Sequence, residues 1–139
     1  MNHFYLIVSL RADHRCEYCH APELVFNFPL EVEHIIPLKQ GGIDAEYNLA
    51  LACRSCNLHK GANIVGVEPD SGLEAQIFNP RQDQWHSHFQ VEMETGMIIG
   101  KTLTGKVTIA LLKINSTSQI AARKLWIQLD LFPYQGINS

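Results

Sequence analysis

The sequence predicts an α+β fold, and three observations support this prediction. Two strand-like runs, residues 30–37 and 48–52, are followed by a helical segment at residues 53–63. Four cysteines flank these elements as two CxxC pairs, and the chain beyond them reads as a β-hairpin followed by two helices. We expect a core over residues 1–66 and an extension over residues 67–139 that packs on it as one compact unit.

The composition is that of a globular protein, with 46% hydrophobic and 18% charged residues. The formal charge of −3 means that the chain has no overall excess of basic residues, which counts against tight, non-specific binding to a nucleic-acid backbone. The apolar run FYLIVSL has no cationic start and is far shorter than the roughly 20 residues of a membrane helix. We therefore expect no membrane partner and a cytoplasmic location.

The pattern of apolar and polar residues over residues 4–15 does not distinguish a helix from a strand.

The cysteines form two knuckles with 33 residues between them. Two residues between cysteines allow one tight turn to aim both thiolates at a single ion, and two such turns complete a tetrahedral shell. A redox role in the manner of thioredoxin would use one pair, leave the other unused and require a βαβ frame that the sequence lacks. We therefore predict a structural zinc ion, closed to other ligands, that is held by Cys16, Cys19, Cys53 and Cys56. The neighbouring His14 and His20 could substitute as ligands, but we expect them to be surface histidines.

The remaining motifs stand between and directly after the knuckles: Glu33-His34, a GG loop, Asn48-Leu49 and CNLHKG. In this order, CEYC … VEHIIPLKQGGID … YNLALACRSCNLHKG, residues 16–61 resemble the HNH endonuclease family in its four-cysteine form. The resemblance implies a ββα-metal core, in which a helix packs across two strands. It also implies hydrolysis of DNA phosphodiester bonds with Mg²⁺ or a similar divalent ion. The alternative is a zinc-stabilised binding or scaffold module whose nuclease motif is silent.

The resemblance also assigns roles to single positions. His34 matches the general base that activates water, and Glu33 matches the adjacent acidic ligand of the catalytic ion. Asn48 matches the residue that orients the loop and so holds the histidine, while Asn57 matches the second ligand of the ion. The chemistry is consistent with these roles, because a neutral imidazole accepts protons near pH 7 and a hard divalent ion prefers oxygen ligands. The plain alternative for Glu33-His34 is a solvated pair at a strand edge.

Helical spacing selects the expected substrate contacts. Asn57 and Lys60 are three residues apart and share a helix face, whereas His59 points elsewhere. We expect Lys60, Arg54 and Lys39 to contact phosphate, and we keep His59 as an additional candidate. Residues 1–66 nevertheless carry five basic and seven acidic side chains, which favours weak DNA binding or the binding-module alternative.

Strand geometry sets a condition on this site. Neighbouring residues of a regular strand point to opposite faces, so Glu33 and His34 serve one phosphate only where the strand twists or ends. We therefore expect regular pairing to lapse within a residue or two of His34, before Pro37. For the extension, a packing role is favoured over a DNA-facing basic stripe, whose members would be Arg81, Lys101, Lys106, Arg123 and Lys124.

Overall fold

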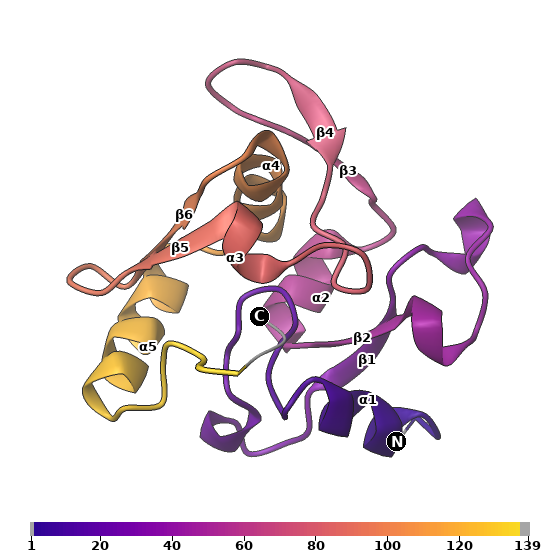
Figure 1. Ribbon diagram of the computed structural model, residues 1–139, viewed down its shortest axis with the longest axis horizontal. Coiled ribbons are helices and arrows are strands. Elements are labelled where there is room, and N and C mark those ends of the chain that lie inside the picture. The colour runs from indigo at the N-terminus through magenta and orange to yellow at the C-terminus, as the bar shows by residue number, and fades with distance from the viewer. Residues whose placement is uncertain (1, 137–139) are drawn as a thin grey trace.

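The computed structural model describes residues 2–136 and has the predicted α+β architecture (Figure 1). Six short strands form three separate antiparallel pairs, and the helices pack around them. The helices are α1 (Tyr5–Arg11), α2 (Arg54–Lys60), α3 (Trp85–His88), α4 (Leu103–Leu112) and α5 (Thr117–Gln128). The strands are β1 (Glu31–His34), β2 (Leu49–Ala52), β3 (Val65–Val67), β4 (Glu74–Gln76), β5 (Phe89–Glu92) and β6 (Met97–Gly100).

The centre of the N-terminal half is a two-stranded sheet with one helix. Strands β1 and β2 pair antiparallel, with Glu31 opposite Ala52 and His34 opposite Leu49. All four residues of β2 are buried, as their uniformly apolar sequence LALA requires. Helix α2 follows β2 immediately, because the Cys53 side chain caps its first turn by accepting from the Cys56 N–H at 3.5 Å. Figure 1 shows α1 next to this sheet and α5 on the opposite side of the molecule, while α4 lies against α2.

The C-terminal half contains the predicted hairpin and helices. Strands β5 and β6 flank the turn at Glu94–Gly96, and α4 and α5 meet near Asn115. Thr102 caps α4, since its hydroxyl accepts from the Gly105 N–H at 3.0 Å. Gly105 is required for close packing, because a Cβ there would lie 2.2 Å from the carbonyl oxygen of His88.

Arg123 of α5 is fully buried and joins three parts of the extension. Its guanidinium donates to the carbonyl oxygens of Gly96, at 2.7 Å, and Ile114, at 2.8 Å. Burial lowers the pKa of Arg123. A side chain without exposed surface cannot contact DNA, so Arg123 does not belong to a basic stripe.

Hydrogen bonds also connect the extension to the cysteine knuckles. The indole N–H of Trp85 donates to the carbonyl oxygen of Tyr18 at 2.8 Å, and Arg15 donates to that of Leu131 at 2.6 Å. The buried apolar residues of both halves form one cluster. Across residues 2–136, no helix combines the length and the apolar character that crossing a membrane requires.

Two segments differ from the sequence-based expectation. The composition of LVFNF, residues 24–28, is strand-like, but the run does not form a strand: Glu23–Val25 is a 3₁₀ turn, and Leu24 is 79% exposed. The glycines and proline of VGVEPDSGLEA, residues 65–75, favour a connector, but the segment lies in the β3–β4 hairpin, in which Val65 pairs with Gln76. In both segments the apolar pattern is short, so tertiary packing decides the conformation rather than local propensity.

Candidate active site and metal centre

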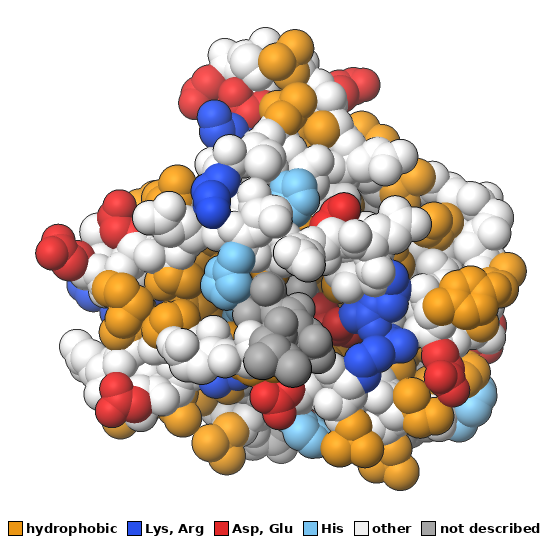
Figure 2. Space-filling view, in the orientation of Figure 1, with side chains coloured by type: hydrophobic (Ala, Val, Ile, Leu, Met, Phe, Trp, Pro, Cys, Tyr) orange, Lys and Arg blue, Asp and Glu red, His pale blue; other side chains and the backbone are white. Residues whose placement is uncertain are grey.

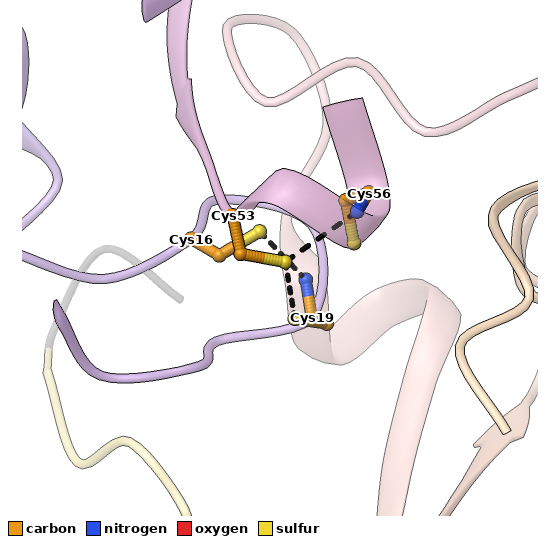
Figure 3. A group of neighbouring side chains, drawn as sticks. All are labelled: Cys16, Cys19, Cys53 and Cys56. Atoms are coloured by element: carbon orange, nitrogen blue, oxygen red, sulfur yellow. Dashed lines mark hydrogen bonds between the residues drawn. The ribbon is translucent and has the colours of Figure 1, made fainter. Parts of the chain in front are cut away.

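The four cysteines come together as predicted (Figure 3). All four are buried, and their sulfur atoms lie within 4.8 Å of one another. The Sγ atoms of Cys19 and Cys53 are 3.7 Å apart, close to the roughly 3.8 Å expected for a tetrahedral site with Zn–S bonds of about 2.3 Å. The backbone supports this arrangement, because the N–H of the second cysteine in each knuckle points to the sulfur of the first at 3.5 Å. The cluster is compatible with a structural zinc ion.

His20 is not the surface residue that the sequence suggested. It is buried, and its ring stacks on Trp85 with 4.0 Å between centroids. Burial, with Arg15 and His86 nearby, lowers the pKa of His20 from 6.5 to about 3. The imidazole is therefore neutral and forms part of the packing around the first knuckle. His14 is exposed as expected, and its Nδ1 lies 2.9 Å from a carboxylate oxygen of Glu23.

Strand β1 ends where the strand geometry requires. His34 is the last residue of β1, and the last strand pair joins it to Leu49. One further backbone bond, from the Ile35 N–H to the Asn48 carbonyl at 2.8 Å, precedes the loop. The expectation that regular pairing lapses within a residue or two of His34 is confirmed.

Glu33 lies in a buried network that joins the first knuckle, β1 and α2. Its Oε1 accepts from the hydroxyl of Tyr18, and its Oε2 accepts from the Lys60 ammonium at 3.0 Å. Lys60 also donates to the carbonyl oxygens of His34 and Ile35, each at 3.0 Å. Burial raises the pKa of Glu33, and the Lys60 charge and the Tyr18 hydrogen bond oppose that shift.

This network corrects one expectation, the phosphate contact of Lys60. The side chains of Lys60 and Glu33 are 1% and 5% exposed. Lys60 therefore cannot contact a phosphate: its three donors are already used inside the protein, where they hold the end of β1. Glu33 lines the groove of His34, and each of its oxygens accepts one hydrogen bond, which leaves a second lone pair on each oxygen for an ion.

Asn57 pairs with a different acid, Glu31. The Asn57 amide donates to Oε1 of Glu31 at 2.7 Å, and Arg54 reaches Oε2 of the same carboxylate at 3.4 Å. The pairing of Glu31 with Asn57 and of Glu33 with Lys60 follows from strand alternation and helical spacing. Glu31 and Glu33 share one face of β1, and Asn57 and Lys60 share one face of α2, so the two elements meet as two polar pairs.

Asn48 fixes the loop between β1 and β2. It is buried, and its Oδ1 accepts from the Ile36 N–H at 2.9 Å while its Nδ2 donates to the carbonyl oxygens of Ile36 and Ile43. Gly42 lies against this clamp, where a Cβ would be only 1.8 Å from the Ile36 carbonyl oxygen. Asn48 therefore holds both ends of the segment that follows His34.

His34 faces an open groove of about 400 Å³ that includes Asn57. Val32 and Glu33 of β1 and Lys39 of the following loop also line the groove, which therefore runs along one edge of β1. This edge is unpaired, because β1 pairs only with β2 among the described strands, so side chains from both faces of β1 can reach the groove. The Nε2 atom of His34 lies 3.0 Å from Oδ1 of Asp44, an exposed loop residue.

The remaining candidates differ in their access to this groove. Lys39 is exposed and lines it, and Arg54 is exposed beside Glu31. His59 is turned away from Asn57, with its Nδ1 2.8 Å from the carbonyl oxygen of Ser55. Figure 2 shows basic side chains in small groups among acidic ones on the face it presents, without a continuous basic stripe. One of the proposed stripe residues, Arg81, is paired with Glu17.

Comparison with known families agrees with this arrangement. Residues 16–63 match the family model described as HNH endonuclease. Residues 16–63 form an HNH domain. The matched residues enclose both cysteine knuckles, β1, β2 and α2. No curated protein and no solved structure matches the chain.

Three contacts in the HNH domain were not anticipated from the sequence: Tyr18 on Glu33, Glu31 on Asn57 and Asp44 on His34. The contact between Glu31 and Asn57 could have been predicted from the sequence, because strand alternation and helix spacing together place a second acid opposite Asn57. The other two depend on how a knuckle and a loop fold back on the sheet. No periodicity encodes such contacts.

Proposed function

We propose that the HNH domain is a metal-dependent DNA endonuclease that hydrolyses phosphodiester bonds. One observation carries the proposal: His34 stands at the end of β1, partly exposed, in an open groove shared with Asn57. A phosphate bound in this groove would lie close to a proton acceptor, His34, and to an oxygen ligand for a metal ion, Asn57. Metal-dependent hydrolysis of a phosphodiester requires both groups.

In the proposed reaction, His34 takes the proton of the attacking water. If Nε2 is protonated and donates to Asp44, the lone pair of Nδ1 is available for this transfer. Asn48 supports the geometry by holding the loop that begins directly after His34. Lys39 and Arg54 are the exposed cations next to the groove and to Glu31, and we assign them to the phosphates that flank the cleaved bond.

Oxygen donors suitable for a hard divalent ion lie beside His34. The Asn57 side chain lines the groove, and its amide can present Oδ1 to a cation, because the two ends of an amide exchange by rotation. A bound Mg²⁺ would stabilise the developing charge on the phosphate and the leaving 3′ oxygen. Glu33 lines the same groove, and we assign it as the acidic ligand of this ion.

A zinc ion at Cys16, Cys19, Cys53 and Cys56 would have a structural role in this proposal. Four protein thiolates leave no position for water or substrate, so the site provides folding free energy rather than chemistry. It would join the 16–19 loop to the start of α2, and Tyr18 extends that connection to β1 through Glu33.

Nicking of supercoiled plasmid tests the proposal. Wild-type protein and His34→Ala are assayed with Mg²⁺ and with Mn²⁺, each with and without chelator, after zinc content and folding have been verified. We expect metal-dependent nicking by the wild type and a loss of about 10²-fold or more in His34→Ala. Zinc-loaded, folded protein that fails to cut with either metal would instead support a binding module with a silent motif, which the net charge of −3 favours.

A further inference from the structure

We propose that Tyr18 is a positioning residue for Glu33, and that the first cysteine knuckle supports the active site through this tyrosine. This role of Tyr18 rests on the proposed endonuclease function, in which Glu33 is the acidic ligand of the catalytic ion. The effect of Tyr18 on metal binding can nevertheless be measured without any cleavage.

Tyr18 lies in the loop that brings Cys16 and Cys19 to the cluster. Its side chain is fully buried, and its ring packs edge-on against Phe78 with 6.4 Å between the ring centroids. The carbonyl oxygen of Tyr18 accepts from the Trp85 indole at 2.8 Å. The flanking cysteines, the ring contact and this backbone bond therefore fix the position of the tyrosine.

The carboxylate of Glu33 is held by two donors, one on each oxygen. The hydroxyl of Tyr18 donates to Oε1, and the Lys60 ammonium donates to Oε2 at 3.0 Å. Donors on different oxygens hold the carboxylate in one orientation, because turning it would strain both hydrogen bonds. Each oxygen keeps a second lone pair, and Glu33 lines the groove of His34. The orientation that the carboxylate presents to the groove is therefore set by one donor from α2 and one from the knuckle.

The two donors have different roles. Lys60 compensates the charge of the buried carboxylate, and it also donates to the carbonyl oxygens of His34 and Ile35. Tyr18 is neutral, and within residues 2–136 its hydroxyl has Glu33 as its single partner. Removing this hydroxyl therefore releases one side of the carboxylate without leaving a buried charge unpaired, which a substitution of Lys60 would do. Tyr18 can thus be tested separately from the stability of the core.

Binding of Mn²⁺ tests this role independently of cleavage. Zinc-loaded wild type, Tyr18→Phe, Glu33→Gln and the double variant Tyr18→Phe/Glu33→Gln are titrated with Mn²⁺, and the free hexaaqua ion is measured by electron paramagnetic resonance. Tyr5→Phe is the matched control, because the Tyr5 hydroxyl also donates to a carboxylate, that of Glu23, at 2.5 Å, and neither residue lines the groove. Zinc content and the thermal midpoint are measured on the same samples.

We expect Tyr18→Phe to keep one zinc ion per chain and to weaken Mn²⁺ binding by at least about tenfold, the lower bound for losing a hydrogen-bonding partner of a metal ligand. Tyr5→Phe should bind Mn²⁺ as the wild type does. In the Glu33→Gln background, Tyr18→Phe should cause no further weakening, because Tyr18 acts through that carboxylate. A tyrosine that only stabilises the fold would weaken binding equally in both backgrounds.

Three results would overturn the positioning role. The first is a folded, zinc-loaded Tyr18→Phe protein that binds Mn²⁺ as tightly as the wild type or more tightly. The second is an equal loss of binding in Tyr5→Phe or, on addition of Tyr18→Phe, in the Glu33→Gln background. The third is loss of zinc from Tyr18→Phe, which would assign the tyrosine to folding. If Glu33→Gln fails to fold or binds no measurable Mn²⁺, the comparison of Tyr18→Phe with Tyr5→Phe decides by itself.

Plasmid nicking separates this result from the proposed function. In an active enzyme, the Mn²⁺ concentration for half-maximal nicking should rise in Tyr18→Phe by the same factor as the dissociation constant. Weaker Mn²⁺ binding by Tyr18→Phe, with a wild type that cuts no DNA, would retain the positioning role and overturn the endonuclease. Cleavage by the wild type with normal Mn²⁺ binding by Tyr18→Phe would do the reverse. A wild type that binds no Mn²⁺ would overturn both.

Discussion

The ammonium of Lys60 lies 3.0 Å from a carboxylate oxygen of Glu33, and both side chains are buried. The pair connects the last residue of α2 to the residue that precedes His34. Because Lys60 also binds the carbonyl oxygens of His34 and Ile35, it fixes the backbone at the end of β1. The position of His34, the proposed general base, therefore depends on a core ion pair rather than on the groove that the histidine faces.

This ion pair predicts a non-additive stability change. Lys60→Met leaves the Glu33 carboxylate buried and unpaired, so we expect the free energy of unfolding to fall by about 3–5 kcal/mol. Glu33→Met/Lys60→Met should recover most of that loss, because no unpaired charge remains. Urea unfolding of the zinc-loaded proteins measures both effects. A Lys60→Met protein as stable as the wild type would show that the pair is not formed.

The cysteine cluster predicts that folding depends on metal. Cys53→Ser should lose zinc and helical circular dichroism together, because a serine hydroxyl can still cap α2 but cannot replace the sulfur that joins the helix to the first knuckle. Ser55→Ala changes a residue between the two knuckle cysteines without removing a sulfur, and it should retain one zinc ion per chain. Metal content and circular dichroism are measured on the same samples. A folded, zinc-free Cys53→Ser protein would contradict a structural role for the cluster.

The contact between Asp44 and His34 predicts an effect on turnover. Asp44→Ala removes the acceptor 3.0 Å from Nε2, so the imidazole loses its orientation, and we expect kcat to fall by roughly tenfold, less than for loss of the base itself. Asp44→Asn keeps an acceptor oxygen and should be closer to the wild type. Glu46→Gln, an exposed acid of the same loop, is the control. A rise in KM at unchanged kcat would instead assign Asp44 to substrate binding.

His20 predicts a loss of stability on mild acidification. Its pKa is lowered from 6.5 to about 3 by burial, so the unfolded chain binds the proton first as the pH falls. The stabilisation is complete above pH 6.5 and decreases toward pH 3 by about 1.4 kcal/mol per pH unit. Unfolding free energies are measured between pH 7.5 and about 5.5 for the wild type and for His20→Phe, which preserves stacking on Trp85. Proton uptake by the cysteines that release zinc on unfolding adds the same pH dependence to both proteins, so the difference between their slopes reports His20. Equal slopes would show that His20 does not contribute.

Short-range patterns determined several features of this protein. The two CxxC spacings predicted the cluster, the run LEVEHIIP predicted a strand that ends at His34, and helical spacing predicted that Asn57 and Lys60 share a face. Each of these depends on geometry within a few residues, which the order of amino acids fixes by itself.

Burial decided what those residues do, and only the tertiary structure provides it. From the sequence, Glu33 and Lys60 are an acid and a base on exposed-looking elements, and Glu31 is one more charge on a strand. The crossing of α2 over β1 and the return of the Tyr18 loop enclose the first two and leave Glu31 open. Because the free energy of a charge depends on its access to water, this enclosure makes Lys60 a core residue that pairs with Glu33, rather than the expected phosphate contact.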